Sequence, residues 1–101
     1  MLLREKDRNS LLEIFKTVEG ASFEVWAYGS RVTGEAHEGS DLDLVIVTST
    51  QEKIALDVLL DLKEKIQESN IPIVVELFDW ARLPKSFHPN IQAQHEVLFR
   101  S

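Results

Sequence analysis

The sequence predicts an α/β (α+β) fold, in which a small mixed sheet carries helices packed on one of its faces. Two segments have apolar residues at helical spacing, and three others are rich in β-branched and aromatic residues with strand-like alternation. With a polar turn and a short final helix, the order along the chain is helix, strand, turn, strand, helix, strand and helix. At 101 residues, we expect a single domain over residues 1–101.

The first helix is predicted to begin at Ser10 and to stop at Gly20. Ser10 and Glu13 match a capping box, and glycine commonly follows the end of a helix. An extension upstream through Leu2 and Leu3 is the alternative start. An apolar stripe supports the helix, and its members are Leu11, Ile14, Phe15 and Val18.

Two strands flank a polar segment. Residues 22–29 alternate apolar and polar side chains, and Gly29 with Ser30 ends that strand. Residues 31–40 are polar and glycine-containing, which indicates a turn of helix and then a loop. Residues 41–48 form a second strand, whose apolar run indicates burial on both faces beyond its first residues.

A second helix and a third strand come next. Ser49 and Glu52 match another capping box, so we expect a helix from there to about Ser69. Residues 71–80 predict the third strand. The helix has one apolar stripe, which consists of Ala55, Leu59, Leu62 and Ile66. After the third strand the sequence predicts a turn, a short helix over residues 86–95 and a final short strand over residues 96–99.

Composition excludes several classes of function. The net charge is −6 and no basic stripe is visible, which argues against DNA or another large nucleic acid as partner. The absence of cysteine excludes disulfides and thiolate metal sites. No stretch approaches the roughly 20 apolar residues of a membrane span. We therefore expect a cytoplasmic protein without a membrane partner.

Asp41 and Asp43 stand at the start of the second strand and carry the candidate chemistry. Residues two apart on a strand point to the same face, so the two carboxylates converge there. Two close carboxylates repel unless a cation neutralises them. Oxygen ligands of this kind suit Mg²⁺ or Mn²⁺, which bind a few carboxylates together with substrate phosphates. The pair predicts a metal ion that carries a phosphate ligand.

A third carboxylate is expected from the third strand, where Glu76 and Asp79 are the candidates. Parity separates them, because Glu76 shares a face with Val74 and Phe78, whereas Asp79 points to the other face or lies past the strand end. We favour Glu76, either as the general base that takes a proton from an attacking hydroxyl or as a ligand of a second metal. A solvated role for Glu76 and a turn or capping role for Asp79 are the structural alternatives.

Gly29 and Ser30 supply the candidate phosphate site. Glycine permits close approach of the backbone, and a short helix that starts here points backbone N–H groups outward. These groups, with the Ser30 hydroxyl, are expected to hold terminal phosphates. Arg31 is either a further phosphate contact or a solvated side chain.

The segment "GSRVTGEAHEGSDLDL" resembles the signature of the nucleotidyltransferase superfamily related to DNA polymerase β. That signature is Gly-Ser, ten residues, and then Asp-x-Asp, here Gly29-Ser30 and Asp41-x-Asp43. The chain resembles more closely the minimal nucleotidyltransferases (MNT proteins), and this resemblance extends over nearly the whole chain, through "VELFDWARLP". Two positions depart from the pattern, because Glu76 stands where the family usually has aspartate and Thr33 where many relatives have arginine.

The resemblance implies the polymerase-β-like nucleotidyltransferase fold and a transfer of a nucleoside monophosphate, usually AMP from ATP, with Mg²⁺. It implies Asp41, Asp43 and Glu76 as catalytic and metal-binding residues and Gly29, Ser30 and Arg31 as nucleotide-binding residues. The implied acceptor is a tyrosine of a HEPN-domain toxin, so the chain would be an antitoxin in a hetero-oligomer. A non-catalytic module that neutralises its partner by contact is the alternative. A transferase for small molecules is a third, although such relatives usually carry an added acceptor domain.

Overall fold

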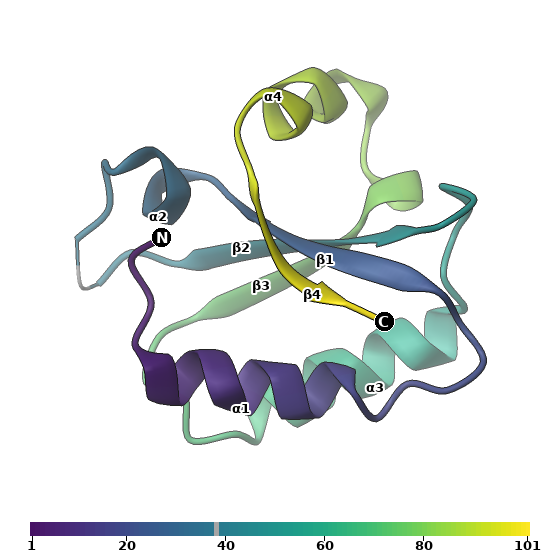
Figure 1. Ribbon diagram of the computed structural model, residues 1–101, viewed down its shortest axis with the longest axis horizontal. Coiled ribbons are helices and arrows are strands. Elements are labelled where there is room, and N and C mark those ends of the chain that lie inside the picture. Colours follow the sequence, from purple (N-terminus) through teal and green to yellow (C-terminus); the bar gives the residue numbers. More distant parts are fainter. Residues whose placement is uncertain (38) are drawn as a thin grey trace.

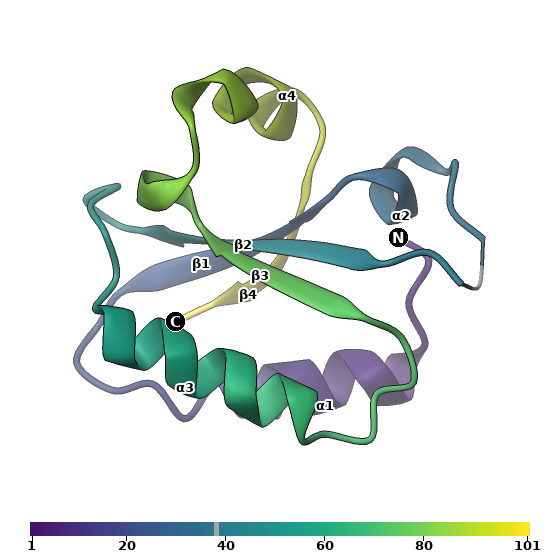
Figure 2. The same cartoon turned by 180° about the vertical axis from the view of Figure 1, so that it is seen from behind.

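The computed structural model describes residues 1–37 and 39–101. Within them one four-stranded sheet has the order β3-β2-β1-β4. The helices α1 and α3 lie on one face of this sheet, and α2 and α4 lie on the other side (Figures 1 and 2). The elements in chain order are α1 (Glu5–Phe15), β1 (Phe23–Tyr28), α2 (Ser30–Thr33), β2 (Leu42–Thr48), α3 (Leu56–Gln67), β3 (Val75–Asp79), the 3₁₀ turns η1 (Trp80–Arg82) and η2 (Lys85–Phe87), α4 (His88–Ala93) and β4 (Glu96–Arg100).

The sheet is mixed, as the sequence predicts. Strand β1 pairs antiparallel with β2 and β4, whereas β2 pairs parallel with β3. A parallel pair needs a crossover connection, and α3 provides it between β2 and β3. The register places Tyr28 opposite Asp43 and Asp43 opposite Glu76. Three residues from three strands therefore lie in one row across the sheet.

The two faces of the sheet bury different side chains. On β2, Leu42, Leu44 and Ile46 belong to the main core with α1 and α3, while Val45 and Val47 point the other way. Side-chain alternation along a strand explains the division. The observed bounds confirm the predicted strands over residues 22–29, 41–48 and 71–80, as well as the final helix and strand. The predicted loop over residues 31–40 includes position 38, which lies outside the described residues.

A second apolar cluster holds α4 against the face opposite α1 and α3. Ile91 of α4 packs with Val45, Val47 and Trp80, and the Trp80 ring meets the Trp26 ring edge-on at 5.5 Å between centroids. Two histidines close the cluster by stacking, His95 on Trp26 at 4.0 Å and His88 on Trp80 at 3.8 Å. The fold thus refines the prediction of helices on one face, because α4 covers part of the second face and leaves the end near Asp43 open.

Both predicted capping boxes are wrong. Helix α1 begins at Glu5, so Ser10 lies inside it and its hydroxyl donates to the Lys6 carbonyl oxygen at 3.1 Å. The helix therefore starts upstream of Ser10, as the alternative with Leu2 and Leu3 proposed, although only from Glu5. It ends at Phe15, well before Gly20. Residues 48–51 form a turn, closed by a 2.9 Å bond from the Gln51 N–H to the Thr48 carbonyl oxygen, and α3 begins only at Leu56.

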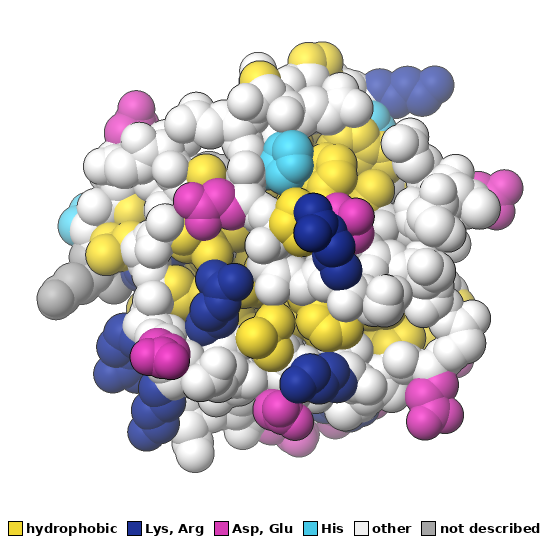
Figure 3. Space-filling view, in the orientation of Figure 1, with side chains coloured by type: hydrophobic (Ala, Val, Ile, Leu, Met, Phe, Trp, Pro, Cys, Tyr) yellow, Lys and Arg dark blue, Asp and Glu magenta, His cyan; other side chains and the backbone are white. Residues whose placement is uncertain are grey.

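Charges of both signs are mixed on the surface. On the face seen in Figure 3, Lys and Arg side chains are interspersed with Asp and Glu, without one continuous basic patch. Among the described residues, none of the helices combines the length and the apolar character that crossing a membrane requires.

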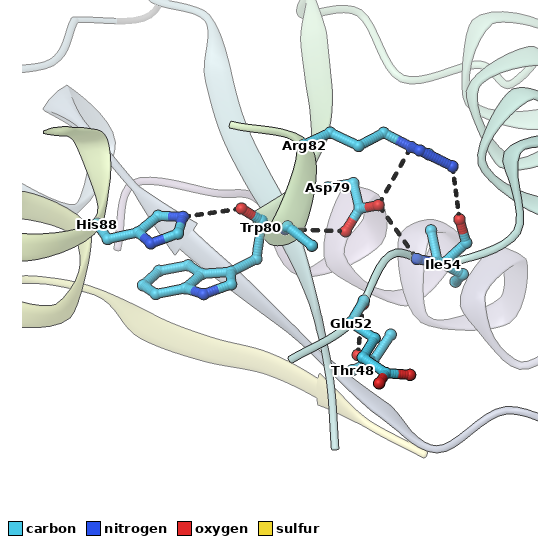
Figure 4. Close-up of polar contacts among 8 residues, drawn as sticks. Thr48, Glu52, Ile54, Asp79, Trp80, Arg82 and His88 are labelled. Carbon is cyan, nitrogen blue, oxygen red and sulfur yellow. Dashed lines mark hydrogen bonds and ion pairs between the residues drawn. The ribbon is translucent and has the colours of Figure 1, made fainter. Parts of the chain in front are cut away.

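Asp79 is a structural residue on the face that packs against α3. The residue is 2% exposed, and its carboxylate accepts hydrogen bonds from the backbone N–H of Ile54 at 3.1 Å and of Ala81 at 3.3 Å. The Arg82 guanidinium pairs with it at 3.3 Å and also donates to the Ile54 carbonyl oxygen (Figure 4). The predicted capping role is confirmed, since Asp79 caps η1 and faces away from Asp43 and Glu76.

Asp79→Ala should lower the free energy of unfolding by about 3 kcal/mol, because it leaves the Arg82 guanidinium and the Ile54 N–H without their buried partner. Asp61→Ala is the matched control, since Asp61 forms an exposed pair with Lys65 on α3 and should cost less than about 1 kcal/mol. Urea denaturation measures both variants. Equal losses in the two would contradict the structural role of Asp79.

Candidate active site

Tyr28, Asp43 and Glu76 form a row on the sheet face opposite α1 and α3. Each comes from a different strand, and the register makes them direct neighbours. Adjacent strands lie about 4.8 Å apart, so side chains of such a row interact. Tyr28 and Asp43 are partly buried, whereas Glu76 is exposed on the edge strand β3. The row therefore runs from a sheltered phenol to an accessible carboxylate.

Negative charge is poorly accommodated in this row. Burial raises the pKa of the Asp43 carboxyl, and the nearby charges of Glu76 and Asp41 raise it further. Burial, then Asp43, then Glu76 raise the pKa of the Tyr28 phenol to about 12. A cation bound among these groups would offset both causes, because it favours the ionised carboxylate and replaces lost hydration.

Gly29 brings the backbone against the Asp43 carboxylate, as the glycine in the sequence leads one to expect. Its backbone has φ 80° and ψ −159°, a conformation reserved for glycine. A Cβ atom built there would stand 2.6 Å from Asp43 Oδ2. Ser30 follows as the first residue of α2, and the Gly29 carbonyl oxygen accepts from the N–H groups of Val32 and Thr33. The candidate phosphate-binding turn thus begins beside the carboxylate row.

Arg31 is buried and bonded to backbone, so its solvated alternative is wrong. The residue is 5% exposed, and its Nε donates to the Ser40 carbonyl oxygen at 2.9 Å. Nη1 donates to the Leu2 carbonyl oxygen at 2.6 Å, and the Leu2 N–H returns a bond to the Arg31 carbonyl oxygen. Arg31 thereby ties the N-terminal segment to the residue that precedes Asp41. Its predicted phosphate contact remains a prediction.

Asp41 lies one residue before β2 and is exposed. The next N–H, that of Leu42, donates to the Val74 carbonyl oxygen at 2.9 Å and so fixes the chain beside β3. Asp41 is close enough to Asp43 to raise its pKa. Yet across residues 1–37 and 39–101 no three acidic or histidine side chains form a ready metal-binding group. The expected three-way convergence is therefore incomplete in the structure.

The residues present still fit a magnesium-type ion. The donors are carboxylate oxygens alone, the class that Mg²⁺ and Mn²⁺ prefer. Mg²⁺ is usually held by one or two carboxylates together with substrate phosphates rather than by a complete protein cage. Asp43 and Asp41 supply such a partial set beside the turn at Gly29. Glu76 of β3, which lies opposite Asp43 in the register, adds a third carboxylate.

Tyr28 is the site residue that the sequence analysis did not identify. The available signal was its position, since it alternates with Trp26 and directly precedes Gly29. The sequence analysis also did not predict a pocket of about 560 Å³ beside Tyr28, which lies between α2 and the segment that contains α4. It depends on the placement of α4 across the sheet, which no local pattern reveals.

Tyr28 is the only tyrosine of the chain, so tyrosinate absorbance reports it alone. We predict a midpoint of about 12 in the wild type and a lower midpoint in Asp43→Asn, which removes one neighbouring negative charge. An unfolded tyrosine ionises near 10, so the stability that Tyr28 contributes is complete below about pH 10 and is lost as pH rises toward 12. A wild-type midpoint near 10 in folded protein, checked by circular dichroism, would contradict the crowded row.

Known proteins are similar to this chain in sequence. A family model described as "Polymerase beta, Nucleotidyltransferase" matches residues 9–101. The chain is 41% identical over 78 residues to a "Probable protein adenylyltransferase MntA" of Haemophilus influenzae. That alignment covers 75% of this chain and 65% of the relative, so the chain spans less than two thirds of that protein's length.

Solved structures share the fold at low sequence identity. A crystal structure of a toxin–antitoxin with AMP-PNP superposes with a TM-score of 0.72 at 17% identity, over 93% of this chain and 73% of that one. A tri-AMPylated Shewanella oneidensis HEPN toxin in complex with MNT antitoxin matches with a TM-score of 0.69 at 13% identity, over 98% and 74%. At such identities the likeness shows the fold alone. From the family match over residues 9–101, the chain belongs to the polymerase β nucleotidyltransferase family.

Proposed function

We propose that this chain is a metal-dependent nucleotidyltransferase that moves AMP from ATP onto a hydroxyl group, and that the acceptor is a tyrosine of a HEPN-type toxin. The observation that carries the proposal is the register of Asp43 with Glu76, directly beside the turn at Gly29. The relative named as a probable protein adenylyltransferase and the AMPylated HEPN toxin found with an MNT antitoxin support the choice of reaction and partner.

Asp41 and Asp43 are the proposed metal ligands, with Mg²⁺ or Mn²⁺ as the ion. When bound, the cation supplies charge neutralisation for the phosphates and for the carboxylates themselves. Gly29 and Ser30 are the proposed phosphate contacts. Arg31 supports this site through the bond from its guanidinium to the Ser40 carbonyl oxygen, which fixes the backbone just before Asp41.

Glu76 is the proposed general base, with the role of a second metal ligand as the alternative. Its carboxylate would take the proton of the acceptor hydroxyl while that oxygen forms a bond to the α-phosphorus and pyrophosphate leaves. Glu76 is exposed on the edge strand β3. A tyrosine presented by a second protein can therefore reach it, which is why we propose a hetero-oligomer with the toxin.

A contact-only antitoxin is the second candidate function. Two features favour this alternative. Among the described residues no three carboxylates form a metal-binding group, and position 76 is a glutamate where the family resemblance implies an aspartate. A longer side chain displaces its carboxylate, and small displacements of reacting groups slow chemistry strongly. In this alternative the chain silences its partner by binding, with no covalent change.

Transfer of labelled AMP to the partner separates the two. The chain is incubated with labelled ATP, Mg²⁺ and the product of its neighbouring gene as the candidate HEPN-type toxin. We expect label on the toxin, none with the double variant Asp41→Asn, Asp43→Asn, and transfer slowed by about 100-fold or more with Glu76→Gln. Asp61→Asn is the matched control and should transfer normally, because Asp61 forms an exposed pair with Lys65 on α3, and α3 lies on the other face of the sheet from the carboxylate row (Figure 1).

Toxin that remains neutralised by the double variant without any label would favour the contact-only antitoxin. A near-normal rate for Glu76→Gln would remove the assignment of Glu76 as the base while leaving the metal ligands in place.

A further inference from the structure

A pocket of about 560 Å³ adjoins the carboxylate row at its sheltered end. Tyr28 and Gly29 form the wall nearest the row, and residues of η2 and α4 form the opposite wall. We call it the α2–α4 pocket, because Thr33 of α2 and Asn90 and Ile91 of α4 line it. Figure 1 labels these two helices. Of its described lining residues, the proposed phosphate and metal chemistry uses Gly29 alone. Tyr28 and Gly29 place the pocket directly beside Asp43.

The position of the pocket relative to Glu76 decides which part of the reaction it serves. The strand order places Glu76 on β3, on one side of Asp43, and Tyr28 on β1, on the other side. In an in-line displacement at phosphorus, the attacking hydroxyl and the leaving group stand on opposite sides. With Glu76 as the base, the acceptor approaches from the β3 side. The in-line axis runs from the acceptor hydroxyl to the leaving pyrophosphate, and the nucleoside lies to the side of it. The acceptor is therefore excluded from the pocket on the β1 side, which is left to a part of the nucleotide.

The chemistry of the lining excludes the phosphates as its main occupant. None of the described residues that line it carries a charge, and they are apolar, hydroxyl or amide residues. A neutral lining of this kind suits a nucleobase. Phe87 adds an aromatic ring in a residue that is 48% exposed, and exposed aromatic rings are stacking surfaces for bases.

Two amide side chains, Asn90 and Gln94, face the same pocket from the α4 segment. A side-chain amide has an N–H₂ donor and a carbonyl acceptor. These match the N7 acceptor and the N6 donor of adenine, respectively. We infer that the α2–α4 pocket receives the adenine base of the nucleotide, with Asn90 and Gln94 as its specificity-determining residues and Phe87 as the ring on which it stacks. This inference rests on the proposed function.

Calorimetric binding to the intact chain tests the inference with five probes, namely the Mg²⁺ complexes of ATP, GTP, CTP, UTP and inorganic tripolyphosphate. In the wild type we expect ATP to bind more tightly than the other three nucleotides. The double variant Asn90→Ala, Gln94→Ala should weaken ATP about tenfold and lose this preference, while tripolyphosphate binds as before. Phe87→Ala should weaken all four nucleotides about fivefold or more and leave tripolyphosphate unaffected.

Gln92→Ala is the matched control, because Gln92 is an exposed amide of α4 that does not line the pocket. It should bind all five probes like the wild type. All substituted residues are exposed, and circular dichroism confirms that each variant is folded.

Failure of the inference is distinct from failure of the proposed function. If AMP transfer occurs but the Asn90, Gln94 double variant keeps the full preference for ATP, the inference is wrong and the transferase stands. If no transfer occurs yet the adenine preference depends on these two amides, the pocket is assigned correctly and the chain binds nucleotide without catalysis.

Discussion

The parallel pairing of β2 with β3 is the constraint on which the candidate site depends. A shift of one residue in this register would turn Glu76 toward the helices and away from Asp43, because side chains alternate between faces. Two buried residues of β3 oppose such a shift, Leu77 in the main core and Asp79 in its bonds with Ile54 and Arg82. Asp79, which is not part of the carboxylate row, thus helps to hold Glu76 in its place in that row.

The second constraint is that α4 and Trp80 cover only part of the sheet face opposite α1 and α3. Ile91 and Trp80 cover Val45, and the next residue of β2 on that face, Asp43, lies where this cover ends. Its carboxylate is therefore partly buried, beside another acid and against the backbone of Gly29. Such a charge costs stability in the absence of a cation, which is the usual physical signature of a site built to bind one.

The alternation of apolar and polar side chains predicts the strands of this molecule and the faces to which their residues point. Alternation over β1 and β2 depends only on which side chains are apolar, so the strands and the position of Asp43 on the face opposite the main core follow directly from the sequence. The same parity separated Glu76 from Asp79. The helix starts were wrong because Ser10 and Ser49 match a capping pattern that also occurs within a helix or a turn.

Other features could not be predicted, since they depend on contacts between distant segments. Arg31 stands at the start of a polar segment, and only the fold brings the Leu2 carbonyl oxygen to it. The strand order makes Tyr28 a neighbour of Asp43. The α2–α4 pocket requires α4 to be fixed over the sheet by the stacking of His88 and His95 on the two tryptophans.

The most direct test of the account is thermal unfolding of the wild type and of Asp43→Asn, each with and without Mg²⁺ and ATP. The raised pKa of Asp43 means that its ionised form weakens the fold near neutral pH, so without ligand the variant should melt no lower than the wild type. Mg²⁺ with ATP should raise the wild-type midpoint by mass action and raise that of the variant much less. An equal rise in both proteins, or none in the wild type, would contradict a cation held by this carboxylate row.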